Sequence, residues 1–159
     1  MNHELDNYFL NRCINYAKMS KDPNTRVGSV IVGPDLKFRS GGYNSFPKDI
    51  KHTPERLNNR DQKLKLTVHA ELNAVLAAAR TGIPLNGCTL YLAATDDTGL
   101  IWGGPPCTRC FVEIRQAGII KIVARPIKAI PSNWHEDLKL SRELIDETGI
   151  EYYEVEVNP

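Results

Sequence analysis

The chain has 159 residues, and its 20 Lys and Arg against 19 Asp and Glu leave a net charge of +1 with histidines neutral. Hydrophobic residues make up 42% and charged residues 25%, which is typical of a globular protein and excludes disordered, collagen-like and coiled-coil chains. The near-neutral charge argues against a large nucleic-acid footprint. This length fits a single domain, which we expect to span residues 1–159.

The sequence lacks the features of a membrane or secreted protein. Its longest strongly apolar run, residues 74–79, is far shorter than the roughly 20 residues that a membrane-spanning helix needs. Residues 1–10 contain Glu4 and Asp6, where a secretion signal would be basic and then apolar. Four cysteines are too few for a disulfide framework. We therefore expect a cytoplasmic protein with no membrane partner.

The first part of the chain predicts a helix, a β-hairpin and a flap. Apolar side chains recur at helical spacing over residues 5–19. Residues 26–32 are apolar and β-branched, and residues 37–43 return after a Gly-Pro-Asp turn, which predicts two paired strands. Residues 44–67 have no sustained periodicity, and an unpatterned stretch of that length indicates a functional loop. We expect it to form a partly helical flap.

The rest of the chain predicts helices that alternate with buried strands. The predicted helices cover residues 68–80, 107–117 and 134–148, and the predicted strands cover residues 88–93, 119–124 and 151–157. Near-continuous apolar strands between helices are typical of a sheet covered on both faces. The element order therefore predicts an α/β fold, a three-layer α/β/α domain around a five-stranded mixed sheet.

Three metal-binding side chains stand at the starts of two predicted helices. His69 begins one of them, and Cys107 and Cys110 begin the next. The two cysteines are three residues apart, so their sulfur atoms project from one helix face and can reach one ion. Two thiolates and one imidazole leave a fourth tetrahedral position open, which is typical of a catalytic zinc. A structural zinc would need a fourth ligand, and the only candidate, Cys88, begins an apolar strand in which core packing is the better interpretation.

Glu71 is the expected acid-base residue beside this ion. It lies two residues after His69 and so points about 200° away around an ideal helix, which argues against a second ligand from the same face. A zinc ion with two thiolates and a neutral imidazole carries no net charge, so it activates water weakly and needs a base nearby. A carboxylate that moves this proton to a ring nitrogen and a departing amine fits hydrolytic deamination of an aminated heterocycle.

The motif H-A-E at residues 69–71, followed by P-C-x-x-C at residues 106–110, resembles the zinc-dependent cytidine and deoxycytidylate deaminase superfamily. Residues 20–28, 42–47 and 69–74 resemble its deoxycytidylate deaminase branch. The resemblance implies one catalytic Zn²⁺ bound by the histidine and the two cysteines of these motifs. It also implies hydrolysis of dCMP to dUMP and ammonia, which feeds thymidylate synthesis, with proton transfer by the glutamate of H-A-E.

The resemblance implies further roles for residues around this centre. Asn44 would contact the substrate sugar, although it could instead cap a turn, and Ala70 and Pro106 would also bind substrate. Separately from the resemblance, the positive charge of Arg26 would attract the substrate phosphate. Many deoxycytidylate deaminases are homohexamers that dCTP activates and dTTP inhibits. Arg80 matches the position of an arginine involved in that response, and Mg²⁺ would accompany such a nucleotide effector. The alternative is that Arg80 only complements the dipole at a helix C-terminus.

Two features depart from the pattern of this superfamily and leave the substrate open. Ser45 stands where members usually have glycine, and residues 102–105, beginning with Trp102, precede the cysteine motif in an unusual way. The alternatives are a deaminase of dCTP, modified dCMP, guanine or tRNA adenosine, or a catalytically silent zinc-stabilised binding module. The flap, residues 44–67, carries six basic and three acidic side chains, a bias that would attract a phosphate unless it is only a solvated face.

Overall fold

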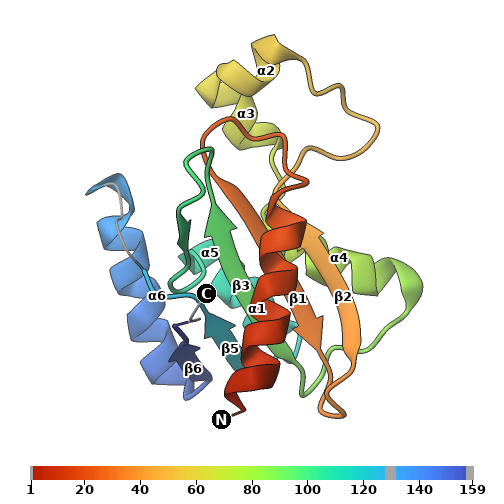
Figure 1. Ribbon diagram of the computed structural model, residues 1–159, viewed down its shortest axis with the longest axis vertical. Coiled ribbons are helices and arrows are strands. Elements are labelled where there is room, and N and C mark those ends of the chain that lie inside the picture. The colour runs from red at the N-terminus through yellow and green to blue at the C-terminus, as the bar shows by residue number, and fades with distance from the viewer. Residues whose placement is uncertain (1, 128–131, 157–159) are drawn as a thin grey trace.

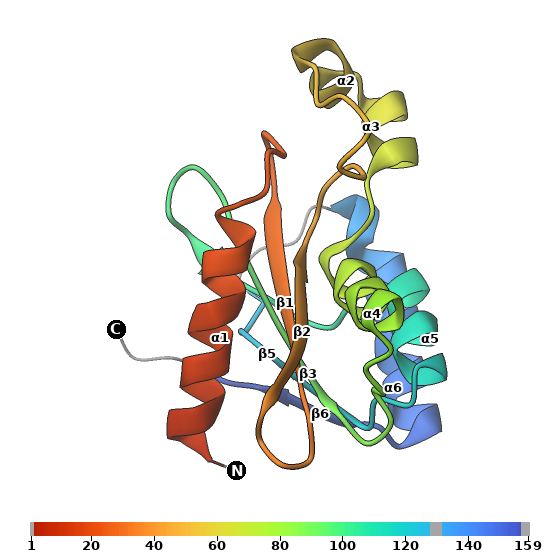
Figure 2. The same ribbon diagram turned by 90° about the vertical axis from the view of Figure 1, so that its right-hand side faces the viewer.

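The computed structural model describes residues 2–127 and 132–156. A mixed sheet lies between helix α1 on one face and helices α4, α5 and α6 on the other, and helices α2 and α3 lie beyond one edge of these layers (Figure 1, Figure 2). The elements, in chain order, are α1 (His3–Ala17), β1 (Arg26–Val32), β2 (Phe38–Tyr43), α2 (Pro54–Asn58), α3 (Arg60–Leu66), α4 (Ala70–Thr81), β3 (Thr89–Thr95), β4 (Ile101–Trp102), α5 (Thr108–Gln116), β5 (Lys121–Ala124), a 3-10 turn (Ser132–Trp134), α6 (His135–Thr148) and β6 (Glu151–Glu154).

The sheet has the strand order β2-β1-β3-β5-β6, with the short strand β4 paired to the end of β3. Strand β1 is antiparallel to β2 and β3, whereas β3, β5 and β6 are parallel. This arrangement confirms the predicted three-layer α/β/α fold and the mixed sheet. Strand β4 is additional to the five predicted strands, because two residues are too few to give a periodic pattern.

The predicted helix starts lie slightly too early in the chain. His69 and Cys107 have extended backbone conformations and cap α4 and α5, so neither lies inside its helix. Val68, which the prediction placed in the helix, lies before α4 and forms an antiparallel β-bridge with Ser45. The two backbone hydrogen bonds of this bridge have N–O distances of 2.8 and 3.1 Å. This bridge closes the base of the flap, and α2 and α3 confirm that the flap is partly helical. At the other end of the chain, β6 ends at Glu154, and residue 157 of the predicted strand lies outside the described residues.

Apolar clusters fill both faces of the sheet. Alternation along β1 sends Val30 and Val32 toward α1 and Ile31 toward the opposite helical layer, as the period of a strand requires. Cys13 and Cys88 are fully buried in these two clusters, which for Cys88 confirms the predicted core packing. Among the residues that the structure describes, no helix is both long and apolar enough to cross a bilayer.

Helix α1 packs directly on the backbone of β1 at Gly28. A Cβ atom added there would overlap the carbonyl oxygen of Cys13 and lie 2.7 Å from the backbone nitrogen of Ala17. Since neither contact atom belongs to a side chain that can rotate away, the whole helix would have to move. This close approach explains why a glycine stands in the middle of an otherwise β-branched strand.

We therefore expect Gly28→Ala to lower the free energy of unfolding by about 1–3 kcal/mol or more, as overpacking does in other cores. Urea unfolding followed by circular dichroism would measure the loss. Asn15→Ala, on the exposed face of the same helix, is the matched control and should change stability by less than about 0.5 kcal/mol. Equal stability of the Gly28→Ala protein and the unmodified chain would contradict the close packing.

Candidate metal centre and its pocket

The side chains of His69, Cys107 and Cys110 converge on one point. The Nδ1 atom of His69 lies 3.5 Å from Sγ of Cys107 and 3.4 Å from Sγ of Cys110, and the three atoms lie within 4.8 Å of one another. Zinc bonds of about 2.1 Å to nitrogen and 2.3 Å to sulfur in a tetrahedron would separate nitrogen and sulfur by about 3.6 Å. The donor types and their spacing therefore fit Zn²⁺, and His69 and Cys107 also line a pocket.

The two helix N-termini explain how these donors are held. His69 and Cys107 are the N-cap residues of α4 and α5, with ψ angles of 155° and 157°, and Cys110 lies in the first turn of α5. Neither cap side chain accepts a hydrogen bond from its own helix, so both are free to face the centre. The positive ends of the two helix dipoles favour anionic sulfur at this place.

The protonation states of the three donors depend on one another. A hydrogen bond with Cys110 lowers the pKa of the Cys107 thiol to about 5. The same contact, together with burial, raises the pKa of Cys110, and a hydrogen bond with Cys107 raises the pKa of His69 to about 9. The three groups therefore titrate as one coupled unit, and metal binding would displace the protons that they share.

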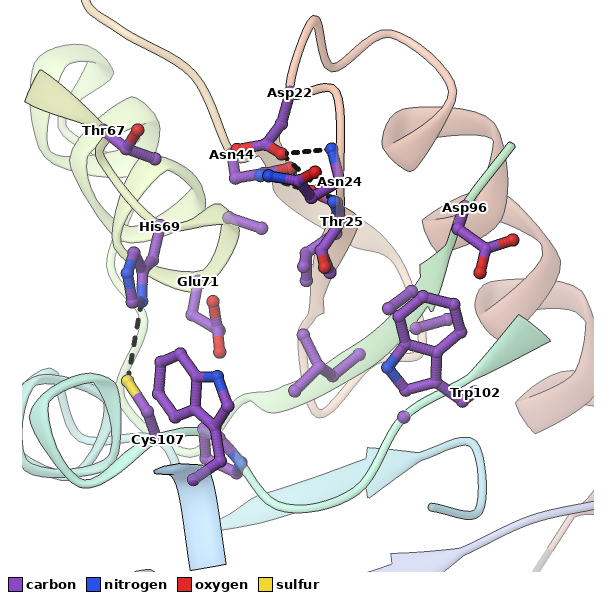
Figure 3. A pocket seen from close by; sticks show the side chains of 18 of the residues that line it. Asp22, Asn24, Thr25, Asn44, Thr67, His69, Glu71, Asp96, Trp102 and Cys107 are labelled. Atoms are coloured by element: carbon purple, nitrogen blue, oxygen red, sulfur yellow. Dashed lines mark hydrogen bonds between the residues drawn. The ribbon is translucent and has the colours of Figure 1, made fainter. Parts of the chain in front are cut away.

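Glu71 lies beside these donors and points into the same pocket (Figure 3). Its side chain belongs to the first turn of α4 and is only 5% exposed. Burial raises the pKa of this carboxyl to about 7, and the negative charge of Cys107 raises it as well. A carboxyl that titrates near neutral pH can both accept and release a proton during a reaction.

The pocket that contains these groups has a volume of about 940 Å³, which lies within the range of small-molecule sites. Its floor includes Leu92 and Ala93 near the carboxyl end of β3. Its walls come from four separate segments. These are the loop at residues 22–25 with Asn44, the flap helices with Leu57, Arg60, Lys63 and Leu64, the β3–β4 hairpin with Asp96, Leu100 and Trp102, and the 3-10 turn before α6 with Asn133 and Trp134. Ligands of open α/β sheets commonly bind beyond the carboxyl ends of the strands, and this pocket lies there.

The structure places three of the four expected substrate-binding residues at this pocket. Asn44, Ala70 and Pro106 line it, whereas Arg26 does not. Alternation along β1 turns Val27 toward the pocket and Arg26 toward the other face, where its guanidinium forms an ion pair with Asp97. The contact of Arg26 with substrate therefore stays a prediction, and in this structure one residue of register separates Arg26 from the face that Val27 presents to the pocket.

The side-chain amide of Asn44 is largely used within the protein. Its Oδ1 accepts a hydrogen bond from the backbone nitrogen of Val27 at 2.8 Å, and its Nδ2 donates to the carbonyl of Thr25 at 2.9 Å. The residue is 8% exposed. Asn44 thus shapes the loop above the pocket, as the turn-capping interpretation suggests, and has one amide hydrogen left for a ligand.

Sequence reasoning missed the ion pair between Asp22 and Lys63 at the pocket wall. Lys63 Nζ lies 3.2 Å from Asp22, and both side chains are 12% exposed. Asp22 also accepts hydrogen bonds from the backbone nitrogens of Asn24 and Thr25, at 2.8 and 3.1 Å. The two partners are 41 residues apart, and only the excess of basic residues in the flap could have drawn attention to one of them.

Comparisons with known proteins agree with this site. Residues 3–125 match the sequence model of the cytidine and deoxycytidylate deaminase zinc-binding region. The chain is 31% identical over 154 residues to the deoxycytidylate deaminase of Pongo abelii, covering 94% of this chain and 78% of that protein. It is also 31% identical over 133 residues to an uncharacterized deaminase of Aliivibrio fischeri, covering 83% and 80% of the two chains.

A solved structure has the same fold. The dCMP deaminase of the cyanophage S-TIM5, crystallised with dCMP and dUMP, matches over 98% of this chain and 99% of that chain, with a TM-score of 0.73 and 20% sequence identity. The family match covers most of the chain and includes the H-A-E and P-C-x-x-C motifs. This chain therefore belongs to the family of zinc-binding cytidine and deoxycytidylate deaminases.

Proposed function

We propose that this protein hydrolyses dCMP to dUMP and ammonia with one zinc ion bound by His69, Cys107 and Cys110. The observation that carries the proposal is the convergence of these three donors with the buried carboxyl of Glu71 in one pocket. Relatives named deoxycytidylate deaminase, one of them aligned over 94% of the chain, support the choice of substrate. The reaction belongs in the cytoplasm, where both thiols of the centre stay reduced.

Glu71 performs the proton transfers of this reaction. When bound, zinc supplies a Lewis acid with an open position at which water is activated near neutral pH. Glu71 takes the proton that the attacking water loses and delivers it to N3 of the cytosine ring. It then moves the remaining proton of that water, now on the C4 hydroxyl, to the amine, so that the C4–N bond breaks, ammonia leaves and C4 becomes a carbonyl. Its pKa of about 7 suits both directions of transfer. A catalytically silent module would have no need for a buried carboxyl at this place.

The flap supplies the cations for the 5′-phosphate. Arg60 and Lys63, both on α3, line the pocket, whereas the pocket-facing side of β1 carries no cation. Lys63 is held by Asp22, and the ion pairs found within the described residues do not include Arg60. We assign Arg60 and Lys63 the phosphate-facing role that the sequence suggested for the flap charge and for Arg26.

We also propose a homohexamer regulated by dCTP and dTTP, with Mg²⁺ bound to the nucleotide effector. Arg80 is exposed at the last turn of α4, about 17 Å along the helix from His69. A rigid helix that joins an interface to a metal ligand would allow an effector to act on the centre.

Purified protein should contain one zinc ion per chain, and Cys107→Ser or Cys110→Ser should lose it, because two donors do not complete a tight tetrahedral site. Elemental analysis of the dialysed protein would measure the content. Cys88→Ala, which changes a buried cysteine outside the centre, should keep the metal. A fully active protein without metal would contradict the mechanism.

Glu71→Gln should keep zinc and fold but lose turnover by a factor of about 10²–10⁴, the usual contribution of a general acid-base group. Steady-state ammonia release and the zinc content of the same sample would be measured together. Loss of zinc would make Glu71 a ligand instead, and unchanged turnover would remove it from the reaction.

The protein should deaminate dCMP with a much higher kcat/KM than deoxycytidine, and added salt should narrow this preference because it screens the phosphate contacts. Arg60→Ala should reduce the ratio of kcat/KM for dCMP to kcat/KM for deoxycytidine by roughly tenfold, which is the effect of one hydrogen bond to a charged group. Arg56→Ala is the control, since that flap arginine donates to the carbonyl of Lys51 outside the pocket. A panel with dCTP, guanine and tRNA would expose another substrate, and equal rates on nucleoside and nucleotide would leave the flap charge as a solvated face.

Regulation predicts sigmoidal dependence on dCMP that becomes hyperbolic with dCTP and Mg²⁺. Arg80→Glu should abolish the effector response while zinc content stays unchanged. Initial rates with and without each triphosphate, together with the mass of the assembly by light scattering, would test both parts. Hyperbolic kinetics that neither triphosphate changes would leave Arg80 as a residue that only complements the helix dipole.

A further inference from the structure

Glu113, on α5, carries a buried carboxylate oxygen that the mechanism does not use. Its Oε1 accepts a hydrogen bond from Nε of Arg109 at 3.0 Å. Its Oε2 is buried and has no hydrogen-bond partner in the described part of the chain. Buried carboxylate oxygens are normally satisfied, so this one requires an explanation.

The position of Glu113 on α5 places it on the side of the helix that faces the metal centre. It follows Cys110 by three residues, which turns it only about 60° from that ligand. Thr108 marks the opposite flank, since its backbone nitrogen and hydroxyl bond to Asp137 of α6 at 3.0 and 2.9 Å. The flank of Cys110 and Glu113 therefore faces α4, whose N-cap is His69.

The charge of Glu113 reaches two of the three donors. Its negative charge contributes to the raised pKa of His69 and to the raised pKa of Cys110. Both effects agree with a carboxylate that lies close to the ligands without being one of them. Within the residues described, the group of side chains able to hold a metal ion does not include Glu113.

The second ring nitrogen of His69 has no hydrogen-bond partner among the residues that the structure describes. Its Nδ1 faces both sulfur atoms, so this nitrogen must be unprotonated when metal binds, and the proton must sit on Nε2. Figure 3 shows one ring nitrogen directed at Cys107 and the other directed away from it. No hydrogen bond of the described residues involves Nε2, although a ligand histidine usually donates this hydrogen to a carboxylate, a carbonyl or a water molecule.

We propose that Glu113 is the outer carboxylate of the metal centre. Its Oε2 accepts a hydrogen bond from a water molecule that in turn accepts the Nε2 hydrogen of His69, and this link fixes the tautomer that leaves Nδ1 free for the metal. The inference rests on the proposed zinc function and adds a positioning residue that neither the H-A-E nor the P-C-x-x-C motif contains. The exposed pair with Arg109 does not account for it, because that pair uses only Oε1 and Arg109 is 84% exposed.

Zinc affinity tests this role without any measurement of activity. Competition with a chelator of known affinity should show that Glu113→Gln binds Zn²⁺ roughly 10- to 100-fold more weakly than the unmodified protein, and Glu113→Ala at least as weakly. Arg109→Ala is the matched control, since it removes the ion pair and leaves the carboxylate, and its zinc affinity should stay within about twofold. Thermal unfolding of the metal-free proteins should be the same for Glu113→Gln and the unmodified chain.

Nuclear magnetic resonance of the zinc-loaded protein gives a second readout. The Nε2 hydrogen of His69 should be slow to exchange in the unmodified chain and fast in Glu113→Gln. Unchanged zinc affinity in Glu113→Gln overturns the inference, and so does an equal loss in Arg109→Ala, which would assign the effect to the ion pair. If the unmodified protein binds zinc and deaminates dCMP but Glu113→Gln leaves the zinc affinity unchanged, only this inference is refuted. If the unmodified chain does not bind zinc at all, the proposed function is refuted as well.

Discussion

The meeting of two helix N-termini is the constraint on which the rest of the structure depends. His69 and Cys107 are 38 residues apart and occupy the same position, the N-cap, of α4 and α5. Their helices pack side by side on one face of the sheet, so two sets of unpaired backbone N–H groups point at one small volume (Figure 2). That volume can hold several anionic groups that would repel one another elsewhere.

The same constraint gives the acidic groups of the centre different properties. In this centre the pKa of Cys107 is lowered to about 5, whereas the pKa of Cys110 is raised. The pKa of Glu71 is raised to about 7. The divergence comes from burial and mutual hydrogen bonds rather than from the residue types. Groups whose pKa values are driven apart are what a site needs if one must bind metal while another moves a proton.

The sequence was most informative where local spacing determines geometry. The C-x-x-C spacing and the step from His69 to Glu71 each span only a few residues at a helix start, so the expected cluster could be read from the chain although His69 and Cys107 cap their helices rather than lie inside them. The apolar strands predicted the sheet. It was least informative about pairs distant in the sequence. Asp22 and Lys63 meet only because the flap folds over the 20–25 loop, and which side chains of β1 face the pocket depends on how that strand pairs with its neighbours.

The bridge between Ser45 and Val68 separates the flap from the chemistry. The bridge closes the loop at Val68, the residue directly before His69. The position of the His69 backbone therefore depends on this bridge and not on the flap helices. A loop on such a closed stem can gain or lose residues at a conformational-entropy cost that grows only slowly with length. Such a fold can therefore acquire a new substrate preference through insertions and deletions in this one loop, while the reaction that it performs on the amino group is inherited unchanged.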